Sequence, residues 1–156
     1  MGGSVFDYTA SGFTVFYFNG KTGFSSPRWY GYPAVNMGDS SPFPPWLLTN
    51  GFAYNTDLQS DPDGDTVSLL MAYALSLNPN ANLSGLMPRP VIAANRMSLT
   101  FHAGSIGISY SVEASDDLRD WSTAGVIISA PDARQCRTAT ANITGASRFL
   151  RLVVGY

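Results

Sequence analysis

The sequence predicts a mainly β protein: an antiparallel β-sandwich of the immunoglobulin or fibronectin kind, with one short buried helix after an acidic loop. Two observations favour this fold class. From residue 90 onward, runs of alternating apolar and polar residues recur about every ten residues, with turn signals between them. Only one segment, 66–77, has the composition of a helix. The 156 residues are 45% hydrophobic, which suffices for a sizeable core, and only 13% charged, which hints at burial against a partner.

The first strand is expected in "GFTVFYFNGKTGF", where Asn19-Gly20 predicts a tight hairpin turn. Both faces of this strand are apolar, so an exposed edge would invite pairing with another chain. We therefore expect residues 1–24 to pair with a neighbouring chain or an edge strand, as in β-augmentation. The expected assembly residues are Phe13, Val15, Phe16, Tyr17 and Phe18.

Residues 25–50 hold five of the ten prolines and several large aromatic residues, which predicts an irregular connection. Such rings most often anchor a loop onto its own core. They can also stack on pyranose rings, which makes this segment the candidate for carbohydrate binding. The candidate glycan-binding residues are Trp29, Tyr30, Tyr32 and Trp46.

The helix is expected over 66–77, with Asp65 or Thr66 as its N-cap and Asn78-Pro79 after its end. It is apolar nearly all round, which is typical of a buried plug. The strands that follow are expected in "RMSLTF", "GISYSVEAS", "AGVIISA", "RTATANI" and "RFLRLVVGY", with a turn at "DDLRDW". The expected organisation is 1–45, an N-terminal hairpin and aromatic segment; 46–80, the acidic loop and helix; and 81–156, the β-sandwich module.

Few residues are suited to catalysis. The single histidine, His102, and the single cysteine, Cys136, are expected at strand positions, and one of each excludes most nucleophilic triads and imidazole metal sites. Glu113 is the only glutamate. The carboxylates of "DDLRDW" are expected to form a turn. The sequence thus predicts no enzymatic activity.

Charge and hydropathy argue against two further classes of protein, nucleic-acid-binding proteins and proteins that span a membrane. The net charge is −2 and the arginines form no run, so nucleic-acid binding is not indicated. No apolar stretch is long enough to span a bilayer. The N-terminus "MGGSVFDY" lacks a basic region and a leucine-rich core, so an exported form would carry its signal upstream or have lost it.

The acidic loop "SDPDGDTV" is the candidate metal site. Asp61, Asp63 and Asp65 occupy positions 1, 3 and 5 of an EF-hand-type loop, whose alternate side chains offer hard oxygens to calcium. Val67 stands at position 7, which donates a backbone carbonyl. The loop departs from the pattern at position 6, where Thr66 replaces glycine, and at position 12, where Ala72 replaces the bidentate glutamate.

The local charge balance favours a cation. Asp57 adds a fourth carboxylate, and no lysine or arginine lies between Arg28 and Arg89. Bound calcium would relieve the repulsion, with Asp57 or water replacing the absent glutamate. We expect weak affinity, about 10⁻⁴–10⁻³ M. A solvated acidic turn and a remnant site are the alternatives.

Residues 46–156 resemble a known bacterial module. The strings "WLLTNGF", "SDPDGDTVSLLMAYALSLNPN", "YSVEASDDLRDW" and "RFLRL" are similar to a C-terminal module of large exported surface proteins of Verrucomicrobia. The resemblance implies a secreted or cell-surface β-rich module with a thrombospondin-type-3-like calcium loop carried by Asp61, Asp63 and Asp65, and no catalysis. Thr66 and Ala72 stand where many members have glycine and glutamate.

The expected function is therefore a non-enzymatic structural module of the bacterial cell surface or extracellular matrix. It would self-assemble through its N-terminal strand, or pack against neighbouring domains of a longer surface protein. The alternative is a carbohydrate-binding module that uses the aromatic residues of 29–46.

Overall fold

The computed structural model describes residues 9–156 and divides the chain into two compact units, Met1–Thr56 and Asp57–Tyr156. The prediction of a mainly β protein is confirmed, because the described residues form nine strands and only two short helices. The expected boundaries at 45/46 and 80/81 do not separate the compact units, whose single boundary follows Thr56.

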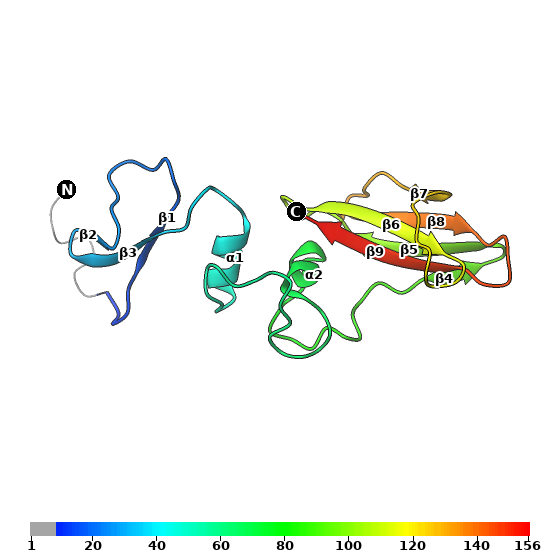
Figure 1. Cartoon of the computed structure of the whole chain (residues 1–156), viewed down its shortest axis with the longest axis horizontal. Coiled ribbons are helices and arrows are strands. Elements are labelled where there is room, and N and C mark those ends of the chain that lie inside the picture. Colours follow the sequence, from blue (N-terminus) through cyan, green and yellow to red (C-terminus); the bar gives the residue numbers. More distant parts are fainter. Residues whose placement is uncertain (1–8) are drawn as a thin grey trace. The chain divides into compact units, whose positions relative to one another are not determined.

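The N-terminal unit holds a small mixed sheet in the order β1-β3-β2 and one helix (Figure 1). The edge strand β1 pairs in parallel with the central strand, and β2 pairs with it antiparallel. The elements are β1 (Val15–Tyr17), β2 (Arg28–Trp29), β3 (Tyr32–Asn36) and α1 (Phe43–Thr49).

The predicted hairpin at Asn19-Gly20 is wrong. A turn does form there, because Lys21 N–H donates to the Phe18 carbonyl over 3.3 Å. Only Gly20 has a positive φ, of 78°, whereas the type I′ turn of a two-residue hairpin needs positive φ at both central residues. The chain therefore does not return beside β1. It makes a further turn and reaches β1 only as β3, in parallel.

The expected irregular connection over 25–50 is likewise corrected, since it contains β2, β3 and α1. The prolines that suggested a loop are compatible with α1: Pro44 and Pro45 lie in its first turn, where a backbone N–H has no helical partner to lose.

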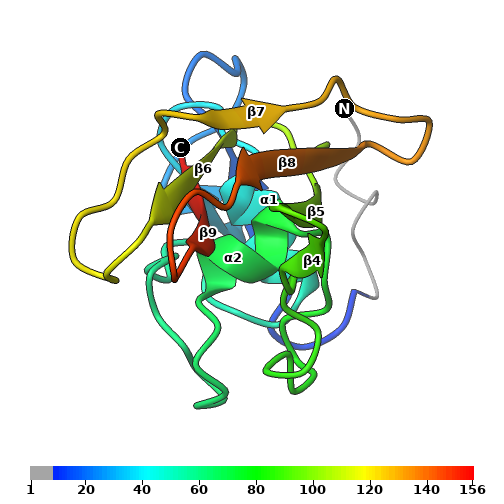
Figure 2. The ribbon, with the colours of Figure 1, turned by 90° about the vertical axis from the view of Figure 1, so that its right-hand side faces the viewer.

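The C-terminal unit contains a four-stranded sheet, β4-β5-β8-β7, and a two-stranded sheet, β6-β9, all antiparallel (Figure 2). Five of its strands lie in the predicted segments. The short edge strand β4 was not predicted, because all three of its residues are exposed and its pattern does not alternate. The strands are β4 (Val91–Ala93), β5 (Arg96–His102), β6 (Ser109–Ser115), β7 (Val126–Ile128), β8 (Cys136–Asn142) and β9 (Phe149–Gly155).

One core joins the two sheets of this unit. Alternate residues of β5 and β8 face alternate residues of β6 and β9, as the period of two in the sequence predicts. Leu75, next to the helix, completes this core. Its buried members are Leu75, Met97, Leu99, Phe101, Val112, Ala114, Ala139, Ala141 and Leu150.

The buried helix is confirmed but shorter than predicted: α2 spans Leu69–Ala74. Its N-cap is Ser68, whose hydroxyl accepts the Met71 N–H over 3.3 Å, because Thr66 has a positive φ and cannot belong to a helix. The helix ends before Ser76, whose φ is 57°. Tyr110 of β6 donates its hydroxyl to the Ala74 carbonyl over 2.8 Å and so fixes α2 against the sheet.

Candidate metal centre

The acidic loop brings together the three carboxylates that the spacing predicted. One oxygen each of Asp61, Asp63 and Asp65 lies within 4.8 Å of the others. Asp61 and Asp63 are exposed, whereas Asp65 is buried. Three converging carboxylate oxygens are a donor set that suits a hard cation.

Asp61 organises the loop through its backbone. One of its oxygens accepts the Gly64 and Asp65 N–H groups over 3.0 and 3.2 Å, and the other accepts the Thr66 N–H over 2.8 Å. An ionised carboxylate has about four lone-pair sites, so these bonds leave capacity for a cation. Asp61, at position 1, therefore holds the backbone of residues 61–66 in a closed loop through these hydrogen bonds alone, without a bound ion.

Asp65 fastens the loop to a distant segment. Its carboxylate accepts the Val67 N–H over 2.8 Å and also the N–H of Leu83, eighteen positions along the chain. Leu83 is itself buried, as are Leu58 and Val67 on either side of the loop. The loop thus has a small apolar base, and Asp65 links that base to the segment that leads into β4.

Thr66 adopts the conformation that glycine would adopt. Its φ is 72°, which is a true outlier for a β-branched residue. Position 6 of the EF-hand pattern requires glycine because the chain turns sharply there. The loop therefore makes the same turn in spite of its sequence, and the surrounding hydrogen bonds to Asp61 hold it.

The pKa values of Asp63 and Asp61 shift in opposite directions. Loss of water raises the pKa of Asp63, and a hydrogen bond to Asp61 and the charge of Asp65 raise it further. The same desolvation acts on Asp61, but the N–H donors of Thr66, Asp65 and Gly64, together with the hydrogen bond to Asp63, outweigh it and lower that pKa overall. A cation at the centre would favour the ionised form of all three groups.

The other predicted ligands lie less centrally. Asp57 is outside the three-carboxylate cluster, and its side chain accepts the Gln59 N–H over 2.9 Å in the preceding turn. Val67 is buried at the base of the loop. Ala72, at position 12, is 1% exposed within α2. A glutamate there would enter the core, so packing explains why the usual twelfth ligand is absent.

The predicted glycan-binding residues form part of an aromatic stack. Trp29 stacks on Phe24 at 5.0 Å between ring centroids, and Tyr30 meets Trp29 edge-on at 4.9 Å. Tyr17 of β1 also stacks on Phe24, at 5.3 Å between ring centroids. Tyr30, with a φ of 47°, is 71% exposed, so one ring of the stack is accessible.

The remaining two candidates make other contacts. Tyr32 begins β3 and contacts Phe13 edge-on at 5.7 Å. Trp46 lies on α1 and accepts hydrogen bonds from Asn50 through its carbonyl. Phe24 was not singled out in the sequence, because it ends the string expected to form a hairpin and no pattern there indicates an aromatic stack.

The predicted assembly residues surround an edge strand. Val15, Phe16 and Tyr17 form β1, which has β3 as its partner on one side within the described sheet. Phe16 is 37% exposed and lies 6.0 Å from the Tyr54 ring. Phe13 and Phe18 flank the strand and are half-buried. The part of the assembly prediction that concerns residues 1–8 lies outside the described residues.

Comparisons with known proteins add no assignment: no protein-family model, curated protein or solved structure matches the chain. Within residues 9–156, neither helix has the length or the apolar character needed to cross a bilayer.

Proposed function

We propose that this chain is a non-enzymatic structural module of the bacterial cell surface or extracellular matrix, stabilised by a weakly bound calcium ion. The convergence of three carboxylates within 4.8 Å carries the calcium part of the proposal. The raised pKa of Asp63 supports it, because the desolvation and the neighbouring carboxylates that raise this pKa leave an unfavourable energy that a bound cation would offset. The positive φ of Thr66 supports it as well, because position 6 of a calcium loop makes this sharp turn. In this role Asp61, Asp63 and Asp65 hold the ion, and water completes its coordination.

The proposed consequence of calcium binding is mechanical. Asp65 connects the loop to Leu83, and the backbone of α2 returns to the loop through Leu70 N–H, which donates to the Leu58 carbonyl over 2.7 Å. An ion in the loop would therefore stabilise the start of α2 and the segment before β4 together. Calcium here would act as a structural staple, which means that it holds the loop, α2 and the following segment together. It would not drive the helix opening by which a calcium sensor works.

The fold supports a structural role. Two antiparallel sheets that share one core favour a β-sandwich of the immunoglobulin or fibronectin kind, a fold that often serves as a surface domain. The proposed location is the cell surface or the extracellular space. The partners are other copies or neighbouring domains, reached through the edge strand β1.

Thermal unfolding with and without calcium tests the staple. With a dissociation constant of about 1 mM, 10 mM calcium should stabilise the native state by about 1.4 kcal/mol, and a chelator should reverse the effect. Asp63→Asn keeps the shape of the side chain and should abolish the shift. Asp39→Asn, in the other unit, is the matched control and should retain it. A shift that persists in Asp63→Asn would place the ion elsewhere.

Light scattering tests assembly through β1. Phe16→Lys places a charge on the edge strand, as natural edge strands do to avoid pairing, and should lower the average mass at high protein concentration. Ile127→Lys places the same charge on an exposed site of another edge strand and should leave the mass unchanged. A wild-type chain that is monomeric at all concentrations would exclude self-assembly.

The second candidate function is carbohydrate binding, favoured by the exposed ring of Tyr30 at the end of the aromatic stack. Titration with a panel of polysaccharides should then change the tryptophan fluorescence of the chain, to which Trp29 contributes, and Tyr30→Ala should remove the response. No response from the wild-type chain would eliminate this candidate.

A further inference from the structure

The C-terminal unit has two well-separated ends. His102 pairs with Cys136 at one end of the β5–β8 ladder, and Arg96 pairs with Asn142 at the other. The short connection 103–108 places the start of β6 beside His102, so β6 ends at Ser115 near the opposite end. We call the end at His102 the helix end, because Tyr110 fixes α2 there. We call the opposite end the turn end, because residues 116–120 lie there (Figure 1).

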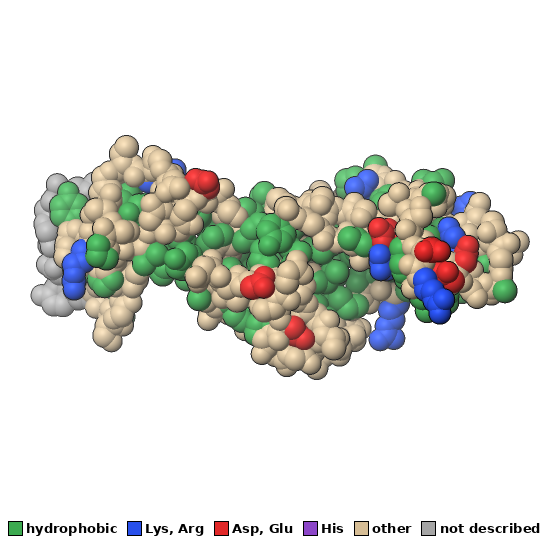
Figure 3. Space-filling model, viewed as in Figure 1, with side chains coloured by type: hydrophobic (Ala, Val, Ile, Leu, Met, Phe, Trp, Pro, Cys, Tyr) green, Lys and Arg blue, Asp and Glu red, His purple; other side chains and the backbone are tan. Residues whose placement is uncertain are grey.

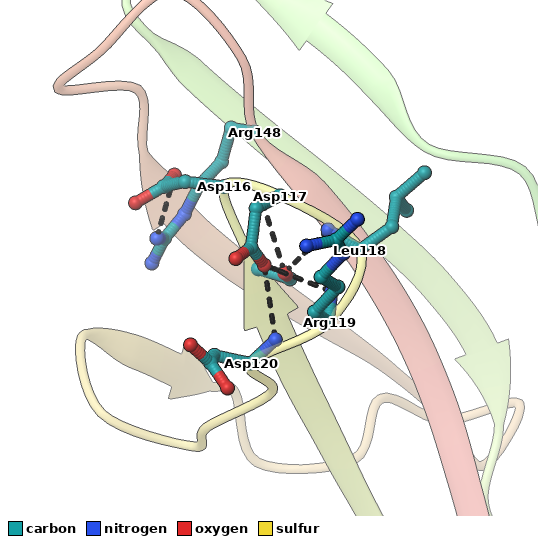
Figure 4. A network of polar contacts seen from close by, with 7 residues as sticks. Asp116, Asp117, Leu118, Arg119, Asp120 and Arg148 are labelled. Carbon is teal, nitrogen blue, oxygen red and sulfur yellow. Dashed lines mark hydrogen bonds and ion pairs between the residues drawn. The ribbon is translucent and has the colours of Figure 1, made fainter.

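The turn end presents Leu118 in a rigid frame (Figure 4). The Asp117 carboxylate accepts the Arg119 and Asp120 N–H groups over 2.8 and 2.9 Å. The Ser115 hydroxyl accepts the Leu118 N–H over 2.9 Å, and Trp121 donates its indole N–H to the Leu118 carbonyl over 3.2 Å. Hydrogen bonds on both sides therefore fix the position of this residue.

Leu118 is both strained and exposed. Its φ is 65°, in the left-handed region that glycine and asparagine adopt more readily. The residue is nevertheless 57% exposed, so burial in its own unit does not offset the strain. A large apolar residue that is strained, exposed and held at the tip of a hydrogen-bonded turn suits insertion into an apolar socket.

The helix end carries such a socket. A groove of about 210 Å³ is lined mainly by apolar side chains of the segment after α2, and the ends of β5 and β8 add polar groups to its wall. A cavity of about 150 Å³ takes up benzene, so this groove has room for one leucine side chain. Leu86, on its wall, is 59% exposed. The lining residues are Leu75, Leu77, Leu86, Pro88, Thr100, Phe101, His102 and Cys136.

The net charge around Leu118 is negative, whereas the net charge around the groove is positive. Around Leu118, three carboxylates face two arginines, one of which, Arg148, bonds Asp116 over 3.1 Å. The segments that border the groove, 88–89 and 132–137, hold three arginines and one carboxylate. Figure 3 shows the acidic and basic side chains gathered over the turn end. The residues are Asp116, Asp117, Arg119, Asp120 and Arg148 at the turn, and Arg89, Asp132, Arg134 and Arg137 at the groove.

We propose that a second copy of this chain occupies the groove, with Leu118 of one copy inserted between Leu86 and Phe101 of the next. The two surfaces are different and lie at opposite ends of the same unit, so the contact is head to tail. Such a heterologous contact forms an open chain of copies unless its rotation closes a ring. The inference extends the proposed structural role, and it uses a surface that does not include β1.

Sedimentation of the full chain over a range of concentrations tests this contact. The wild type should form a concentration-dependent series of species. Leu118→Gly removes the side chain and fits the positive φ, so the variant should fold and associate at least about tenfold more weakly. Leu86→Glu, at an exposed site, should have the same effect by placing a carboxylate opposite the acidic turn. Ile127→Glu, exposed on β7, is the control and should behave as the wild type.

Mixing the two variants gives the most specific result. Leu118→Gly retains an intact groove and Leu86→Glu retains an intact Leu118, so an equimolar mixture should form one-to-one dimers and no larger species. Association that both variants retain would overturn the head-to-tail contact while leaving assembly through β1 intact. Association lost only in Phe16→Lys, or a wild type that remains monomeric, would also overturn it.

Discussion

Individual residues in left-handed conformations lie in both of the proposed binding regions of the C-terminal unit. Thr66 in the acidic loop and Leu118 in the exposed turn both have positive φ without being glycine. In each case an aspartate side chain accepts the backbone N–H groups around the strained residue. The hydrogen bonds to these aspartates thus determine the path of the backbone, and they hold Thr66 and Leu118 in the left-handed conformation.

Thr66→Gly should stabilise the protein by about 1 kcal/mol. Relief of the left-handed conformation gains about 1–2 kcal/mol, and the greater flexibility of glycine in the unfolded chain returns part of it. Urea unfolding measures the difference. Thr66→Ala keeps the strain and is the control; a destabilised Thr66→Gly would show that the threonine side chain makes an essential contact.

Asp117 should make stability depend on acid pH. The Asp120 and Arg119 N–H groups and the Ser115 hydroxyl lower its pKa from the usual 3.8. Its ionised form is therefore favoured by folding, and this stabilisation is present above about pH 4 and is lost as the pH falls through the lowered pKa. In Asp117→Asn the melting temperature should fall less steeply below pH 4 than in the wild type. Asp120→Asn, in the same turn, should follow the wild-type curve; equal slopes for all three proteins would contradict the assignment.

At the scale of elements, the connections of the acidic loop matter more than its regular structure. Helix α2 has only six residues and could not be stable alone. It is held by its buried face, by Tyr110, and by the loop that Asp65 closes. The loop, helix and following segment therefore behave as one element.

Asp65→Ala should destabilise this element by about 2–4 kcal/mol even without calcium, because the buried N–H groups of Val67 and Leu83 would lose their acceptor. Asp63→Ala, at an exposed position of the same loop, should cost much less in calcium-free buffer. Chemical denaturation with a chelator present compares the two. Equal effects would mean that Asp65 acts only as a metal ligand.

At the scale of the whole molecule, the division after Thr56 has a thermodynamic consequence. The main core lies entirely within the C-terminal unit, from Leu75 to Leu150. Residues 57–156 should therefore fold without the N-terminal unit, with a single cooperative transition and the same calcium-induced shift as the full chain. Circular dichroism and calorimetry of the fragment measure both; a fragment without a transition would show that the N-terminal unit is required for folding.

The predictability of the structure varied along the chain. The strands from Arg96 onward follow from alternation, because one face of each meets the core and the other does not. The hairpin at Asn19-Gly20 failed because the turn type depends on the φ of both central residues, which the dipeptide does not fix. In the acidic loop, spacing predicted the meeting of Asp61, Asp63 and Asp65, but not that Asp57 lies outside their cluster.

The sequence by itself determined the β-rich class, the buried helix and the carboxylate cluster, because these depend on local periodicity and on residues a few positions apart. The tertiary structure decided the parallel pairing of β1, the bond from Asp65 to Leu83, and the placement of Leu118 and the groove at opposite ends of one unit. Each of these brings together residues that are distant in the chain. No local pattern encodes such contacts, because they arise only when each unit folds and brings distant segments together.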